Sequence, residues 1–457
     1  MSLEMRDFLS KNKFSLGFFP LVACNGVSVG TSGIAVTLYA VHMGATASQI
    51  GLIRGFESLG ILLGVFLMGL LVDHIGPRKV FMCGGLAAGV GYLWLVQASS
   101  PGVLMVWVGI IGFCVSSRMV SMNSIFMGQL KSIGNHKSGW YRASHSIGFS
   151  FIGPLLGGAV IHGEGYPITF RVVSLLFLIS VGLASIVLEA EKRIGTPKES
   201  LSAGSLKTGA PIPALGMGTP KESLSAGSLK TGARSGFSPA ETWVQTKRLF
   251  RNRLFIQTAS TEGVITATMS CFNTFAVVLA LRVYGLSQED AAFLVALHGI
   301  VFIFSLFFLG RFLARWGSNF FYFSSLSIGL TALFLLGGTP GFGLAVAGLL
   351  LLAVSLGMLT VVNYSALSDI PGERGKMAGV YGVFSVSGMA LGPALGGVLG
   401  EAFGLRAIFL GLTPLFLLLG ISRFWTRHGT EDRSDPSGDL SLGAGGKSTS
   451  FRHEPTQ

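Results

Sequence analysis

The chain contains a series of long apolar stretches, and these constrain its fold more than any other feature. A helix that crosses a lipid bilayer needs about 20 predominantly apolar residues. Half of the 457 residues are hydrophobic and only 12% are charged. Twelve stretches are long enough, and they lie at 15–41, 49–72, 80–98, 103–124, 140–161, 168–188, 255–280, 291–313, 320–338, 342–366, 377–400 and 405–424. The sequence thus predicts an all-α membrane protein with twelve transmembrane helices.

The same proline-glycine segment occurs twice, about 240 residues apart. Gly153–Gly158 reads GPLLGG and Gly392–Gly397 reads GPALGG, each inside an apolar stretch. Proline bends a membrane helix, and glycine allows two backbones to approach closely. Three further pairs share the spacing, namely Asn123 and Asn363, Gly69 and Gly310, and Gly76 and Gly317. We therefore expect two pseudo-symmetric six-helix bundles related by a parallel repeat.

Four segments follow from this pattern. We expect an N-terminal six-helix bundle at 1–190, a cytoplasmic linker at 191–254, a C-terminal six-helix bundle at 255–426 and a disordered cytoplasmic tail at 427–457. The linker contains GTPKESLSAGSLKTGA twice, at 195–210 and 218–233, and this composition has too little apolar surface to fold alone. Residues 241–255 are predicted to form an amphipathic helix on the membrane surface.

Lysine and arginine concentrate in the connections on one side of the predicted bundle. Outside the linker these residues are Arg78, Lys79, Lys131, Lys137, Arg142, Arg311, Arg315, Arg374 and Lys376. The positive-inside rule then predicts cytoplasmic termini and a cytoplasmic linker, in a multi-pass protein of the cell inner or plasma membrane. The net charge of +12 is therefore a topology signal. Because no soluble module combines basic and aromatic residues, we expect no nucleic-acid partner.

A charged segment follows the second apolar stretch. Asp73 is expected at the C-terminal end of one helix, and Arg78 and Lys79 at the start of the next. Both signs oppose the local helix dipoles. The positive-inside rule explains the two basic residues but not the acid. We therefore expect Asp73 to pair with an arginine or a helix start on the cytoplasmic face, with a solvated charge as the alternative.

This segment resembles the motif between the second and third helices of the major facilitator superfamily. The matching residues are Gly69, Asp73, Gly76, Arg78 and Lys79, while His74 stands where arginine is usual. The resemblance implies twelve helices in two rocking halves and a conformational latch that helps to hold the outward-facing state. The counterpart in the second half has Ala314 in place of the acid, so we expect the latch to be one-sided.

The proline-glycine segments resemble a second motif of that family, which is associated with exporters that exchange protons for drugs or metabolites. The residues concerned are Gly153, Pro154, Gly157 and Gly158 in the fifth stretch, and Gly388, Gly392, Pro393, Gly396 and Gly397 in the eleventh. By themselves these residues indicate helix packing and a hinge. The resemblance implies a drug or metabolite to proton antiporter.

Charged groups at membrane depth require a reason, since each costs about 3 kcal/mol on insertion scales. Arg54 and Glu57 lie one helical turn apart and could pair with each other. The repeat also places Glu57 opposite His298, and these two could exchange a proton across a central cavity. The sequence leaves both interpretations open.

Further proton-coupling or cavity candidates are Arg118, His145 and Glu262, of which Arg118 resembles the family's fourth-helix arginine only loosely. Candidate polar residues of a substrate cavity are Asn25, Asn123, Asn273 and Asn363. For Asn25 and His145 the alternative is an interhelical polar group with a satisfied hydrogen bond.

These observations predict a secondary transporter that works by proton-coupled export. The alternative is a proton symporter that imports a metabolite or organic anion, and a third is a non-transporting receptor or scaffold acting through the linker. The sequence contains no phosphate-binding loop of the Gly-x-x-x-x-Gly-Lys type, so we do not expect ATP to power transport directly. The four cysteines are isolated, with no metal or redox spacing, so we expect no metal and no cofactor. Because the sequence contains no metal or nucleophile constellation, we expect no enzymatic activity. The expected partners are a small-molecule substrate, protons and the lipid bilayer, and we expect a monomer.

Overall fold

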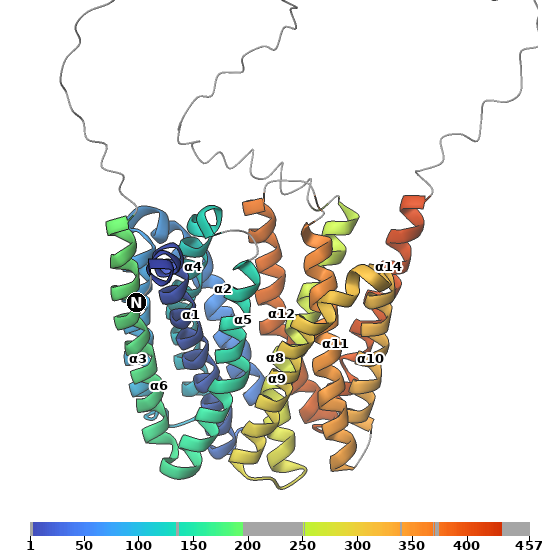
Figure 1. The fold of residues 1–457 in the computed structure, drawn as a ribbon. Coiled ribbons are helices and arrows are strands. Elements are labelled where there is room, and N and C mark those ends of the chain that lie inside the picture. The colour runs from blue at the N-terminus through green and yellow to red at the C-terminus, as the bar shows by residue number, and fades with distance from the viewer. Residues whose placement is uncertain are drawn as a thin grey trace, which may run out of the picture.

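The computed structural model describes residues 3–133, 137–194, 250, 252–338, 341–368, 370 and 374–431, and these are almost entirely helical (Figure 1). The N-terminal half consists of α1 (Leu3–His42), α2 (Ala47–Ile75), α3 (Pro77–Leu95), α4 (Pro101–Ile133), α5 (Lys137–Ser146), the π-helix η1 (Ile147–Ile152) and α6 (Gly153–Ile194). The C-terminal half consists of α8 (Arg253–Arg282), α9 (Gln288–Trp316), α10 (Ser318–Gly338), α11 (Phe342–Ser368), α12 (Arg374–Phe403), α13 (Ala407–Leu410) and α14 (Thr413–Glu431).

The predicted class of twelve transmembrane helices in two bundles is confirmed. Ten helical stretches in the described part of the chain are long and apolar enough to cross a membrane. One of them, Ala143–Val187, has 45 residues and contains two crossings, because Gly165 (φ 77°) reverses the chain within α6. The shorter α3 lies between α2 and α4 and supplies the remaining crossing.

Several helices extend beyond the apolar stretches. Helix α1 begins at Leu3, and α14 continues to Glu431, so the first five residues of the expected disordered tail are helical. A helix ends where its backbone hydrogen bonds end, and hydropathy does not mark that point. The tandem repeat, most of the predicted amphipathic segment and the rest of the tail lie outside the described residues.

The two halves repeat each other in backbone detail. The positive-φ glycines of the described chain form three pairs about 240 residues apart, Gly44 with Gly285, Gly76 with Gly317, and Gly165 with Gly404. Each pair occupies the same turn in its half, where a left-handed conformation favours glycine. Helices α2 and α9 also begin alike, since the side chains of Thr46 and Ser287 both cap the third backbone N–H.

The halves meet through two pseudo-symmetric helix crossings. Helix α12 crosses α2, and the η1–α6 segment crosses α9. A Cβ atom at Gly51 would lie 2.2 Å from the carbonyl oxygen of Pro393, and one at Gly299 would lie 1.9 Å from that of Ser150. Glycine is therefore required where the backbones touch. Both proline-glycine segments lie at these crossings, which accounts for their duplication.

The ends of the molecule differ. We call the end where α6 stops at Ile194 and α8 starts at Arg253 the linker end, and the opposite one the far end (Figure 1). At the far end the Glu401 carboxylate accepts hydrogen bonds from Thr46 Oγ1 (2.9 Å) and Ser48 N (3.1 Å), and Arg282 donates to the carbonyl of Ala45 (2.7 Å). These contacts join the two halves and close the far end.

Candidate transport site

A small pocket lies between the two halves. Helices α1, α2, η1, α6, α8 and α9 contribute to it, and its lining consists of Gly30, Gly33, Ile34, Arg54, Phe149, Ser150, Pro154, Asn273 and Val295. Two of the polar sequence candidates, Arg54 and Asn273, therefore line one pocket from opposite halves. A concave site with an apolar wall and few polar groups is typical of small-molecule binding.

Arg54 and Glu57 form an ion pair on α2, as their spacing indicated. Arg54 Nη1 donates to Glu57 Oε2, and the two side chains are only 15% and 9% exposed. Within the described chain, Nε and Nη2 of Arg54 have no hydrogen-bond partner. The guanidinium thus has Glu57 on one side and the pocket on another.

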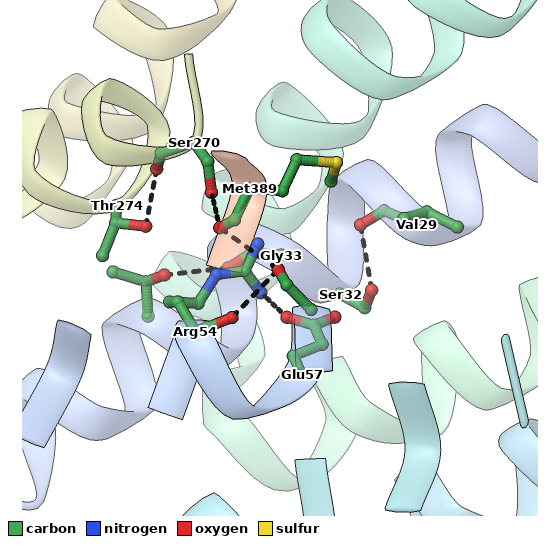
Figure 2. A network of polar contacts seen from close by, with 10 residues as sticks. Val29, Ser32, Gly33, Arg54, Glu57, Ser270, Thr274 and Met389 are labelled. Carbon is green, nitrogen blue, oxygen red and sulfur yellow. Dashed lines mark hydrogen bonds and ion pairs between the residues drawn. The ribbon is translucent and has the colours of Figure 1, made fainter. Parts of the chain in front are cut away.

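A carbonyl oxygen freed by proline ties this pair to the other half. Pro393 has no N–H, so the carbonyl of Met389 lacks its partner within α12. Ser58 Oγ and Ser270 Oγ donate to that oxygen at 3.3 Å and 3.0 Å, which joins α2, α8 and α12 at one atom (Figure 2). Ser58 Oγ also lies 3.2 Å from the carbonyl of Arg54. The ion pair is therefore next to the contact between the halves.

Glu262 on α8 forms a separate cluster within the C-terminal half. It is buried, and its Oε2 accepts hydrogen bonds from the Tyr381 hydroxyl and from Asn363 Nδ2 (3.3 Å). Ser385 Oγ donates to Oε1 at 3.3 Å. Asn363 Nδ2 also lies 3.0 Å from the Tyr381 hydroxyl. Helices α8, α11 and α12 thus meet around one carboxylate, and no basic side chain of the described residues contacts it.

Arg118 does not line the pocket. Its side chain is fully buried inside the N-terminal half, with the guanidinium over the rings of Phe177 (4.2 Å) and Phe81 (5.4 Å). Nη2 donates to Ser180 Oγ at 2.6 Å. Arg118 therefore points into the N-terminal half and not into this pocket, because α4 turns its side chain toward α3 and α6.

Within the described residues, Glu57 and His298, the pair predicted to exchange a proton, do not contact each other. Glu57 is occupied by Arg54, while the ring of His298 stacks on Phe272 with 4.0 Å between centroids. His298 is buried, and its Nε2 has no partner among the described residues. The repeat places the two residues at equivalent positions, but their side chains point to different neighbours.

The remaining polar candidates, His145, Asn25 and Asn123, lie in three different surroundings. His145 stacks on the pocket residue Phe149, with 5.9 Å between centroids. Asn25 is buried, and its Oδ1 has no partner in the described chain. Asn123 is exposed and accepts a hydrogen bond from the Tyr141 hydroxyl at 2.7 Å. Of these three, His145 is the one that touches the pocket wall.

The motif between α2 and α3 has the expected turn but not the expected pairing. Gly76 ends α2 with φ 89°, and α3 begins at Pro77. Asp73 is exposed and has no hydrogen bond or ion pair within the described residues, so the predicted pairing is wrong for this conformation. His74 instead bonds back to the carbonyl of Leu70 through Nδ1 (2.8 Å). The motif lies at the linker end, away from the far-end contacts that hold the halves together.

Sequence reasoning missed several residues at these sites. Tyr381 and Ser385 had no signal, because they approach Glu262 from another helix. Met389 had one, since a proline four residues later always frees a carbonyl. Glu401 was also missed, because only the fold brings the end of α12 to the start of α2.

Two six-helix halves with a closed end and a pocket between them are the architecture of a secondary membrane transporter. The sequence-family model of the Major Facilitator Superfamily matches residues 18–385 and 323–455 of this chain. The chain belongs to this superfamily.

Comparison with solved structures agrees at the level of the fold. A bacterial homolog of the human lysosomal transporter Spinster, in an inward-facing and unoccupied conformation, is 14% identical with a TM-score of 0.67, over 93% of this chain and 99% of that one. The nucleoside transporter NupG is 14% identical with a TM-score of 0.61, over 90% of this chain and 97% of that one. A search of curated proteins found no match.

Proposed function

We propose that the chain moves a small molecule across the membrane by alternating access and couples this movement to protons, with export as the direction. The observation that carries the proton coupling is the Glu262 cluster. Its carboxylate is buried at membrane depth and contacts three neutral donors from α11 and α12. An ionised group in this environment is costly, and a proton would remove the charge. Loss of the charge would weaken the hold of three helices on one another.

The closed far end supports alternating access. With the linker end on the cytoplasmic side, as the lysine and arginine distribution predicts, this conformation corresponds to an inward-facing state. The unpaired Asp73 agrees with a latch that engages only when the linker end closes. The proposed direction of transport, export, rests on the resemblance of the proline-glycine segment Gly153–Gly158 to the exporter motif. The same segment packs closely on α1 and α9, as a hinge requires.

A flux experiment tests the proposal. Inside-out vesicles with an acid interior are given a panel of solutes, and loss of the gradient is followed in chain-bearing and empty membranes. An antiporter takes solute into the lumen and releases protons, so the gradient falls. We expect Glu262→Gln to abolish this response, whereas Glu164→Gln, a change of an exposed acid, should leave it intact. If Glu262→Gln and Glu57→Gln both keep full pH-dependent transport, the coupling proposal is wrong.

Proton symport of an organic anion is a second candidate, because Arg54 lines the pocket and its Nε and Nη2 have no acceptor among the described residues. The sign of the response separates the two. A symporter would carry protons into the same vesicles with the solute, and the lumen would become more acidic.

A deletion tests the scaffold alternative. Removal of residues 195–234 should leave flux unchanged in a transporter, since both halves remain. A scaffold acting through the linker would lose its activity. Loss of flux with normal folding would therefore contradict the transport proposal in its present form.

A further inference from the structure

We propose that the pocket between the halves binds an organic anion, a small carboxylate with an apolar body, through the free edge of the Arg54 guanidinium. This inference rests on the proposed transport function but not on its direction. It names the chemical class of the substrate, which the fold alone leaves open.

Arg54 has unused hydrogen-bonding capacity. A guanidinium carries five N–H donors in a planar fork. Nη1 is engaged with Glu57, whereas Nε and Nη2 have no acceptor among the described residues. These two nitrogens share one edge of the fork. A carboxylate matches such an edge with two parallel hydrogen bonds, which is the strongest neutralising contact available to arginine.

The charge of the pocket lining comes from one side chain. Of the nine described residues that line the pocket, Arg54 is the one with an ionisable side chain. Glu57 lies on α2 beside the guanidinium and is not part of the lining. The lining therefore offers guanidinium N–H donors and none of the carboxylate oxygens that a cationic ligand would need. A neutral ligand would leave the arginine donors without a charged acceptor.

The rest of the pocket wall is mostly apolar. Phe149, Ile34 and Val295 offer an apolar surface, while Asn273 adds an amide from the C-terminal half. The space between these walls is narrow in this conformation, so a ligand of this kind would enter as the two halves move apart. The pocket thus suits a small acid with one apolar face. A ligand held by Arg54 and Asn273 together would contact both halves, as a transported substrate must.

Gly33 keeps the guanidinium accessible. A Cβ atom at this position would lie 3.3 Å from Arg54 Nη2, with no other side chain as close. A methyl group there would occupy space beside the nitrogen that the carboxylate needs. Gly33→Ala should consequently weaken anion binding without touching the ion pair with Glu57.

Ligand-induced stabilisation of the purified full-length protein tests the inference. The probes share one ring and differ in charge: benzoate, benzamide, benzylammonium and phenyl phosphate. We expect benzoate to raise the thermal unfolding midpoint by several degrees at saturation, because a ligand that binds only the folded state stabilises it. Benzamide and benzylammonium should give no shift. Phenyl phosphate distinguishes a carboxylate site from a phosphate site.

Variants locate the effect. Arg54→Gln alone leaves Glu57 unpaired and risks misfolding, so the double variant Arg54→Gln/Glu57→Gln is measured beside it. The double variant should lose the benzoate shift, and Arg311→Gln, an exposed arginine over Phe308, should keep it. Gly33→Ala should weaken benzoate binding about tenfold, the scale of one lost hydrogen bond to a charged group. Gly182→Ala, with open space around the new methyl group, should not.

Several outcomes overturn the inference. These are an equal shift with benzamide, a shift with benzylammonium, a shift with phenyl phosphate alone, no shift with any carboxylate, or a benzoate shift that survives in the double variant. The result is independent of the vesicle experiment. Benzoate binding without proton movement would leave this inference standing and contradict proton coupling, and proton movement driven only by cations would do the reverse.

Discussion

Two buried carboxylates, Glu57 and Glu262, lie in opposite halves of the molecule, each a similar number of residues from the start of its helix. Glu57 is ten residues into α2 from the far end, and Glu262 is nine residues into α8 from the linker end. Both are less than one tenth exposed. Their partners differ completely. Glu57 contacts a guanidinium on its own helix, whereas Glu262 contacts a hydroxyl, an amide and a second hydroxyl from two other helices.

This difference separates the roles that sequence alone assigned to both residues. The charge of Glu57 is balanced locally, and its loss would leave Arg54 without a counter-charge at the edge of the pocket. The charge of Glu262 has no such balance, and its loss would change how three helices are held. Depth in the membrane therefore marks a residue as important, but the identity of the neighbours decides what it can do.

The largest effect should come from breaking the ion pair on one side only. Arg54→Gln leaves a buried carboxylate without its cation, and removal of one partner of a buried pair typically costs about 3–5 kcal/mol. Arg54→Gln/Glu57→Gln removes both charges and should recover most of that loss. Reversible unfolding of the purified protein in mixed detergent micelles measures both. A double variant as unstable as Arg54→Gln alone would show that the unpaired charge of Glu57 does not cause the loss of stability.

Glu262→Ala should have a smaller cost, because its partners are neutral. The Tyr381 hydroxyl and the Asn363 amide would lose the carboxylate as an acceptor, although Asn363 would keep its hydrogen bond to Tyr381, and the cost should be about 1–3 kcal/mol. Glu262→Gln keeps an acceptor oxygen and should recover most of the stability, yet still abolish proton coupling. The same unfolding assay, combined with vesicle flux, separates the two effects. If Glu262→Gln is as unstable as Glu262→Ala, the carboxylate charge itself stabilises the cluster.

A single donor of the Glu262 cluster should matter less again. Tyr381→Phe removes one hydroxyl and retains the ring, with an expected cost of about 0.5–1.5 kcal/mol. Ser385→Ala removes the longer contact at 3.3 Å and should cost less than Tyr381→Phe. The order of these two variants in the unfolding assay is the check. The reverse order would mean that the amide and Ser385, and not the tyrosine, hold the carboxylate.

Much of the architecture was predictable because it depends on local sequence. Helix number follows from the apolar stretches, and the two-fold repeat follows from the proline-glycine segments. The Arg54–Glu57 pair was predictable for the same reason, since residues three apart on a helix share a face. In each case the relevant distance along the chain is short or the pattern is duplicated.

The contents of the sites were less predictable, because they depend on how helices rotate and slide against one another. Arg118 sits in an apolar stretch like Arg54, but its helix turns it into the interior of one half. Tyr381 and Ser385 reach Glu262 from another helix, more than 100 residues later in the chain. No spacing rule connects such residues. By contrast, the free carbonyl of Met389 could have been inferred from Pro393, and its serine partners then sought.

A third carboxylate, Glu401, is expected to have the smallest effect of the three when it is changed. It is exposed, and it accepts hydrogen bonds from Thr46 and Ser48 across the far-end contact between the halves. Its counterpart in the repeat is His162, which lies 3.9 Å from Glu289 at the equivalent crossing. Both pairs join the end of one helix to the first turn of a helix in the other half. Only the Glu401 contact includes a backbone N–H at the start of a helix, so we expect it to contribute more to closure.

Glu401→Gln should consequently loosen the far end without changing the folding of either half. In a cysteine-free background, Asn273→Cys reports access to the pocket through its reaction with a membrane-impermeant maleimide supplied at the far end. We expect Glu401→Gln to raise the labelling rate by no more than a few fold, since exposed pairs contribute little. His162→Ala, whose partner contact is longer and mostly in solvent, should raise it less. A larger effect of His162→Ala would mean that closure of the far end depends more on the His162–Glu289 contact than on the Glu401 contact, although the two halves are alike in backbone.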